Sequence, residues 1–201
     1  MHPDSEIRRL LDLLPASGRM MTQLVNKPEQ LLVVDSAFPR PWQRQRLVSI
    51  NFDLLGRLSK PQRDLLVLRT VTWVTAVKWF RPQPYQGLVL AGALGATVEA
   101  LQGDAVGILV GAGLSAIAAT QIWRQNHSAQ RELEADEAAL RVAQRRGYSE
   151  TDAARHLLSA MEAVAQLEQR GLSFNELLRC QNLKAIAGLS PVSVPEELRR
   201  D

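Results

Sequence analysis

The sequence feature that most constrains the fold is an apolar segment from Tyr85 to Trp123, in which only Glu99 and Asp104 are charged. Its second part, Ala105 to Trp123, carries no charge, and an uncharged apolar run of roughly 18 or more residues is a transmembrane helix candidate. Gln102-Gly103-Asp104 is typical of a turn, since Gly tolerates positive φ and Asp bonds its own backbone. The segment therefore predicts an apolar helical hairpin over 85–123 that spans a membrane.

Basic residues flank both ends of this hairpin. Lys78 and Arg81 precede it and Arg124 follows it, so the positive-inside rule predicts that both chain termini lie on the cytoplasmic side. An apolar helical pair can also be buried in the core of a soluble protein, and Glu99 disfavours deep burial in lipid. A membrane location is thus the leading hypothesis, and a cytoplasmic location is the alternative.

Composition excludes few classes of protein. The 201 residues carry a formal net charge of +3, with basic and acidic residues interleaved, which argues against a nucleic-acid partner. The basic and aromatic loop at 40–46 is more often simply solvated than a nucleic-acid site. One cysteine excludes an intrachain disulfide. The acidic start, with no apolar region behind it, argues against a cleaved secretory signal.

Proline residues divide the chain. They recur up to Pro84 and resume only at Pro191, and proline in a helix interior costs about 3 kcal/mol, so the segment between them is free to be helical. We predict an N-terminal helical segment at 1–30, a helical domain at 31–190 that contains the hairpin 85–123, and a tail at 191–201.

Periodicity predicts an α+β fold that is predominantly α-helical. Residues 31–34 and 46–52 read as two strands of a small antiparallel β-hairpin. Between 59 and 80, β-branched residues leave a strand as the alternative to a helix, although length favours the helix. Apolar spacing together with capping and breaking residues predicts helices at 6–14, 19–25, 54–58, 59–80, 130–146, 149–171 and 173–187.

An acidic motif lies in the helix that follows the hairpin. Glu132-Leu133-Glu134-Ala135-Asp136 precedes Ala138-Ala139 and Arg146-Gly147-Tyr148. Together with the apolar hairpin, the small sheet and the polar helix start at 59–64, this order of parts resembles the membrane-associated zinc metallopeptidases related to the heat-shock and prenyl-protein proteases. The resemblance covers roughly residues 31 to 170 and implies a similar fold.

In those peptidases an HExxH helix supplies two histidine ligands and a glutamate base, and the acidic motif supplies the third ligand. The resemblance gives these last positions to Glu132, as ligand, and Asp136, as its support. The segment aligned with HExxH reads Arg69-Thr70-Val71-Thr72-Trp73, so both histidines and the base are absent. The resemblance therefore implies a pseudopeptidase that holds no metal and uses no cofactor.

The acidic motif has two further interpretations. The plainer one is an acidic first turn that complements the helix dipole. The sharper one is a structural ion pair in which Arg69 binds Glu132 or Asp136 where zinc would join the helices.

Other reactive residues point to no site. His2, His127 and His156 share no helical face with the acidic motif, and Cys180 lies on an apolar helix face, which predicts a buried, inert thiol. The chain also resembles a cyanobacterial family of uncharacterised proteins, which implies no activity. The motifs of that resemblance are Phe38-Pro39-x-Pro41-Trp42, Pro61-Gln62-Arg63-Asp64 and Arg179-Cys180-Gln181-Asn182-Leu183.

The sequence favours a non-catalytic, membrane-associated scaffold or interaction protein that has membrane lipid as a partner. The alternative is a soluble helical binding module with the hairpin buried in its core. A residual hydrolase is a third hypothesis, and the missing zinc ligands and base argue against it. No catalytic residue, metal site or cofactor is predicted.

Overall fold

The computed structural model describes residues 2–38, 43, 45–76, 113 and 129–190. The predicted tail at 191–201 and nearly all of the predicted hairpin at 85–123 lie outside these residues. The chain divides into two compact units, residues 1–77 with 129–201 and residues 78–128, and the description below concerns the first. Its elements are α1 (Pro3–Leu13), α2 (Ala16–Met21), β1 (Thr22–Asn26), β2 (Val34–Ser36), β3 (Arg46–Ile50), α3 (Phe52–Leu55), α4 (Lys60–Ala76), α7 (Ala129–Gln144), α8 (Glu150–Leu167) and α9 (Phe174–Ile186).

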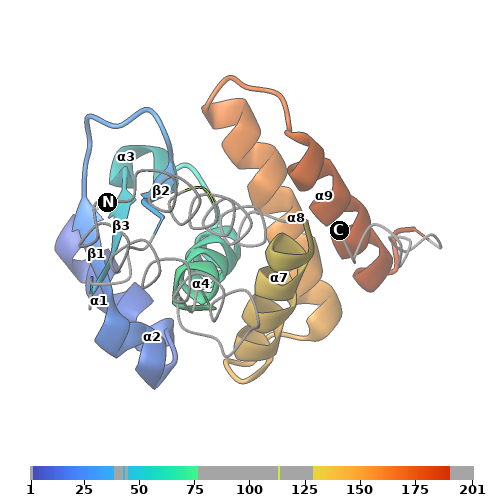
Figure 1. Cartoon of the computed structure of the whole chain (residues 1–201), viewed down its shortest axis with the longest axis horizontal. Helices are drawn as coiled ribbons and strands as arrows, with labels where there is room; N and C mark the ends of the chain where they lie inside the picture. Colours follow the sequence, from blue (N-terminus) through green and yellow to red (C-terminus); the bar gives the residue numbers. More distant parts are fainter. Residues whose placement is uncertain (1, 39–42, 44, 77–112, 114–128, 191–201) are drawn as a thin grey trace, which may run out of the picture. The chain divides into compact units, whose positions relative to one another are not determined.

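The first unit is helix-rich and contains a three-stranded mixed sheet, which confirms the α+β class (Figure 1). The strand order is β1-β3-β2, with β3 antiparallel to β2 and parallel to β1. The predicted antiparallel pairing is thus present between β2 and β3, but only Val34 of the predicted strand 31–34 lies in β2. The strand predicted over 46–52 ends at Ile50, and α3 occupies Phe52–Leu55 rather than 54–58.

The strand β1 corrects the prediction of a helix over 19–25. The helix α2 occupies Ala16–Met21 and the chain then becomes extended. Thr22 and Leu24 are buried while Gln23 is exposed, which is the alternation of a half-buried strand. Pro15 separates α1 from α2 and stands at the N-cap of α2, where its missing N–H group is not needed.

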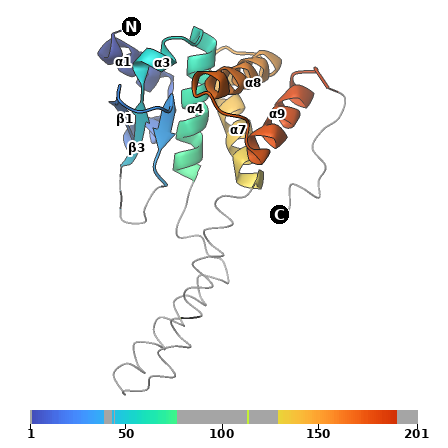
Figure 2. The ribbon, with the colours of Figure 1, turned by 90° about the horizontal axis from the view of Figure 1, so that it is seen from above.

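The helix α4 lies between the sheet and the C-terminal helices (Figures 1 and 2). It contacts α1, α2, β2 and β3 as well as α7 and α8. Leu65, Leu68 and Val71 are almost completely inaccessible and belong to a core that also contains Leu10 of α1 and Leu157 of α8. Burial on both sides explains why this segment is a helix despite its β-branched residues.

The three C-terminal helices are present as predicted, and local signals set their ends. Gly147 has a φ of 94° after α7, and the Ser149 hydroxyl accepts a hydrogen bond from the Asp152 N–H at the start of α8. Ser173 and Glu176 form a reciprocal capping box at the start of α9. The helix α8 ends at Leu167, four residues before the predicted end at Gly171. Within the described ranges, no helix is both long and apolar enough to cross a membrane.

Candidate functional site

The structure brings together the three residues of the predicted ion pair, Arg69, Glu132 and Asp136. Arg69 lies on α4, and the two carboxylates lie one turn apart on α7, where the spacing of four residues puts them on one face. The Arg69 guanidinium forms an ion pair with Glu132, and its Nε is 3.3 Å from Asp136 Oδ1. A single side chain of α4 thereby binds two carboxylates of α7, those of Glu132 and Asp136.

A second arginine, Arg179 of α9, completes this cluster. Its Nε and Nη2 donate to the two carboxylate oxygens of Asp136, each at 2.8 Å, and its Nη1 is 3.9 Å from Glu132. Sequence reasoning did not connect Arg179 with the acidic motif. The available signal is that Arg179 directly precedes Cys180, which the sequence predicts to be buried. We call Arg69, Glu132, Asp136 and Arg179 the ion cluster.

The ion cluster is buried and its formal charges balance. Asp136 is inaccessible, and the side chains of Arg179, Arg69 and Glu132 are 8%, 15% and 17% exposed. Burial lowers the pKa of Arg69 from its ordinary value, and repulsion from Arg179 acts in the same direction, while the Asp136 carboxylate opposes both. Because buried charges are tolerated only when they are paired, these four groups depend on one another.

The rest of the segment aligned with HExxH takes part in packing and hydrogen bonding. The Thr72 hydroxyl lies 2.8 Å from the Arg69 carbonyl and 3.1 Å from that of Ala135, so it links α4 to α7. The Thr70 hydroxyl donates to a carbonyl within its own helix, that of Leu66. Trp73 packs edge-on against Phe38, with ring centroids 6.2 Å apart.

A cavity of about 190 Å³ lies beside the ion cluster, and Arg69 and Arg179 are among its lining residues. Its other charged groups are paired with one another. Arg170 donates to both oxygens of Glu176 at 2.8 Å and to Glu168 at 2.7 Å, and Glu168 also accepts a hydrogen bond from the backbone N–H of Val33. Among the lining residues, only Thr70 carries a hydroxyl, and no lining residue is a histidine or a cysteine. No nucleophile with an adjacent histidine base is therefore assembled in this cavity.

The remaining predicted residues lie apart from the cluster. His2 is at the start of α1, His156 lies edge-on to Tyr148, and His127 falls outside the described residues. Cys180 is buried, as predicted, and burial raises the pKa of its thiol. In the part of the chain that the structure describes, no three His, Cys, Asp or Glu side chains are grouped to hold a metal ion.

Comparison with known proteins identifies a family to which the chain is similar, and the description of that family assigns no activity. A family described as "Protein of unknown function (DUF3318)" matches residues 8–148, from α1 to Tyr148. No curated protein and no solved structure matches the chain. The matched segment contains Arg69, Glu132 and Asp136, whereas Arg179 lies beyond it.

Proposed function

This chain belongs to the DUF3318 family of proteins of unknown function, and we propose that it is a non-catalytic, membrane-associated scaffold or interaction protein. The ion cluster is the observation that carries the proposal. A catalytic zinc site needs three protein ligands and an open position for water. Here the carboxylates of Glu132 and Asp136 already accept charge-assisted bonds from arginine side chains, which compete for the same lone pairs.

We further infer that the domain is a pseudopeptidase, a degenerate relative of the membrane-associated zinc metallopeptidases, from a cyanobacterial family. Arg69 and Trp73 stand at the two positions where those peptidases carry histidine, and Thr70 stands at the position of the base. The contacts of these side chains support a structural role, since Arg69 joins two helices and Trp73 packs against Phe38.

Membrane association rests on the apolar run from Ala105 to Trp123 and its basic flanks. A soluble binding module is the second candidate, because the described unit has its own core and exposes several large apolar side chains. Exposed apolar side chains that gather on a surface can mark an interaction site. The exposed large apolar side chains of the described unit include Leu31, Leu32, Phe174 and Leu177.

Zinc content tests the non-catalytic assignment. The full chain, purified after expression in zinc-supplemented medium, is expected to contain far less than one zinc per molecule by plasma mass spectrometry. It is also expected to leave an unfolded protein such as casein intact. Stoichiometric zinc together with casein cleavage that stops after chelation would overturn the assignment and favour the residual hydrolase.

An alkaline carbonate wash of isolated membranes tests the location. We expect the full chain to stay in the membrane pellet. A Leu114→Arg variant places a charge in the middle of the uncharged run, which costs several kcal/mol in lipid, so it should move toward the soluble fraction, whereas Leu114→Ala should not. A wild-type chain that appears in the soluble fraction without detergent would favour the binding module.

A further inference from the structure

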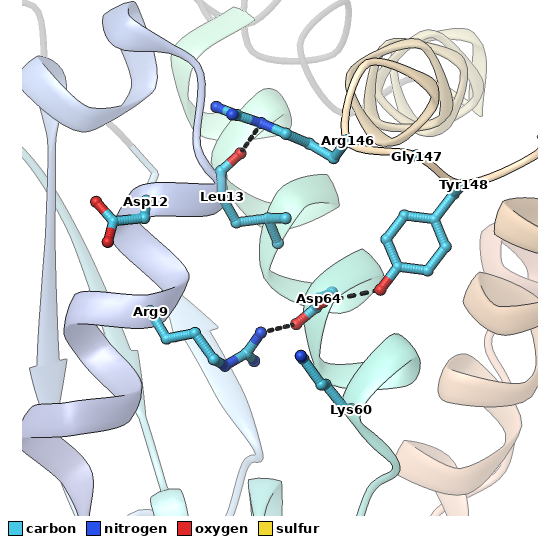
Figure 3. A pocket seen from close by; sticks show the side chains of 8 residues that line it. All are labelled: Arg9, Asp12, Leu13, Lys60, Asp64, Arg146, Gly147 and Tyr148. Atoms are coloured by element: carbon cyan, nitrogen blue, oxygen red, sulfur yellow. Dashed lines mark hydrogen bonds and ion pairs between the residues drawn. The ribbon is translucent and has the colours of Figure 1, made fainter.

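A second cavity, lined by none of the residues of the ion cluster, lies between α1, the start of α4 and the turn that joins α7 to α8. It measures about 350 Å³, and Figure 3 shows the side chains that line it. They include Arg9 from α1, Lys60 and Asp64 from α4, and Arg146 and Tyr148 from the turn. Two motifs singled out in the sequence, Pro61-Gln62-Arg63-Asp64 and Arg146-Gly147-Tyr148, thus meet at this cavity.

One wall of the cavity consists of paired charges, in which the carboxylates of Asp64 and Glu6 face the guanidinium groups of Arg9 and Arg63. Asp64 is 3% exposed, accepts the Tyr148 hydroxyl at 2.9 Å and lies 2.7 Å from Arg9 Nη1. Arg9 also donates to both oxygens of Glu6, at 2.9 and 2.7 Å. Burial and the Asp64 carboxylate raise the pKa of Tyr148 to about 12, so the phenol stays protonated at neutral pH. These contacts hold Tyr148 in place.

Among the described residues, two cations of the cavity have no carboxylate within ion-pair distance. Arg146 donates through Nε and Nη2 to the carbonyls of Leu13 and Leu14, both at 3.0 Å, so its charge meets neutral oxygens. Lys60 has no carboxylate within ion-pair distance in the described part of the chain; the pKa of the Glu6 carboxylate is lowered mainly by its hydrogen bond with Arg9 and, to a small extent, by the charge of Lys60. Asp12, the other lining carboxylate, has a side chain that is 80% exposed and lies 3.8 Å from Arg19. The cavity therefore carries excess positive charge.

We propose that this cavity binds a phosphate group, with Lys60 and Arg146 as its cationic ligands. A phosphate monoester carries nearly two negative charges and three strong acceptor oxygens at neutral pH, which suits two unpaired cations, and both Lys and Arg are common phosphate ligands. The volume leaves room for more than the phosphate alone. The group belongs either to a free phosphorylated small molecule or to a lipid headgroup. The site shares no residue with the ion cluster, so it does not depend on the function proposed above.

Titration with inorganic phosphate tests the site directly. The full chain in mild detergent is titrated with sodium phosphate at constant ionic strength, and binding is followed by calorimetry and by the midpoint of thermal unfolding. Lys60→Gln should weaken phosphate binding about tenfold, which corresponds to one lost charge contact, and Lys60→Arg should retain it. Lys27→Gln is the matched control, because Lys27 is also an exposed lysine but lies between β1 and β2.

Vesicles distinguish the two sources of phosphate. Binding of the full chain is compared on phosphatidylcholine vesicles with and without phosphatidic acid. If soluble phosphate raises the midpoint of thermal unfolding of the wild type and of Lys27→Gln, but not that of Lys60→Gln, the result supports a free phosphorylated ligand. If phosphatidic acid increases vesicle binding of the wild type and of Lys27→Gln, but not of Lys60→Gln, while soluble phosphate leaves the unfolding midpoint unchanged, the result supports a lipid headgroup. The proposal is overturned if neither probe has an effect that Lys60→Gln removes and Lys27→Gln keeps.

Discussion

At the scale of single residues, Arg69 is the cation through which α4 binds the acidic face of α7. Its guanidinium faces Glu132 and Asp136, and Arg179 is the other cation beside these carboxylates. Arg69→Glu would leave three carboxylates around one guanidinium in a buried site. We expect this substitution to lower the free energy of unfolding by roughly 3–5 kcal/mol, as when a buried pair loses one partner. Urea unfolding measures the change.

Arg141→Glu provides the matched control on the surface of α7. The Arg141 side chain is 64% exposed and its Nη1 lies 3.9 Å from Glu137, and exposed pairs of this kind contribute about 0–1 kcal/mol. The same charge reversal should therefore cost much less at Arg141. An effect of Arg69→Glu that stays within about 0.5 kcal/mol, the range of surface substitutions, would mean that the ion cluster does not stabilise the fold.

Glu176 makes the stability of the unit depend on acid pH. Its hydrogen bonds with Arg170, and in second place those with Ser173, lower its pKa to about 2. Since the folded pKa lies below the ordinary value, this stabilisation is present above about pH 4.5 and is lost as the pH falls toward about 2. The free energy of unfolding of the wild type should exceed that of Glu176→Gln by about 1–2 kcal/mol near neutral pH, after allowance for solvent screening.

Urea unfolding at several pH values measures this difference between the wild type and Glu176→Gln. It should shrink between about pH 4.5 and about pH 2 and stay nearly constant above that window. Arg170→Gln removes the dominant partner and should flatten the same dependence. A difference that is equal near pH 7 and near pH 3 would rule out the Arg170–Glu176 pair as its source.

At the scale of elements, sequence predicts best where a helix carries its own end signals. Ser173 and Glu176 mark the start of α9, and Ser149 marks that of α8, because each cap is a contact between residues close in sequence. Thr22–Asn26 was mistaken for helix because its strand conformation depends on pairing with Arg46–Ile50. Such pairing between distant segments leaves little trace in a local pattern.

The ion cluster shows the same limit within one site. The four-residue spacing of Glu132 and Asp136, together with the resemblance to the metallopeptidases, was sufficient to suggest Arg69 as their partner. Arg179 was missed because 43 residues separate it from Asp136 and the helix α9 brings it back. Periodicity indicates that one face of α9 is buried, but it does not indicate which element covers that face.

Close packing of α2 against α4 gives a prediction for Gly18. A Cβ atom at this position would lie 3.0 Å from Cγ1 of Val71, in the core. Gly18→Ala should therefore destabilise the protein by about 1–3 kcal/mol, the usual cost of overpacking. The double variant Gly18→Ala/Val71→Ala should show a favourable coupling energy in urea unfolding, since Val71→Ala makes room for the new methyl group.

Gly171→Ala is the control for this prediction. The space around Gly171 is open and its φ is not positive, so alanine should be neutral there or stabilising by up to about 1 kcal/mol through the unfolded state. If Gly18→Ala is also neutral, or if Val71→Ala adds its full cost to that of Gly18→Ala, α2 does not pack closely against α4.

At the scale of the whole molecule, the family match and the folded unit end at different places. The match stops at residue 148, whereas α8 packs on α4 and α7, and α9 packs on α7 and α8. Leu157 and Leu158 of α8 belong to the same core as Leu68 of α4. A chain that ends at Tyr148 would expose this core and leave the buried Asp136 without Arg179.

We therefore expect a chain of residues 1–148 to lose the single cooperative urea transition. Each buried Leu that becomes exposed costs roughly 1.5–3 kcal/mol, and the total stability of a small domain is only about 5–15 kcal/mol. A chain that ends at Ser190 is the control: it keeps α8 and α9 and should unfold cooperatively, close to the full chain. Both are compared in the same detergent by urea titration and amide hydrogen exchange.

If residues 1–148 retain a cooperative transition and slow exchange in α4 and α7, then α8 and α9 are not needed for folding, and the matched segment folds on its own. If the transition is lost only in this chain, Arg179 and the apolar face of α8 are required parts of the domain, and the ion cluster needs both the matched segment and the helices beyond it.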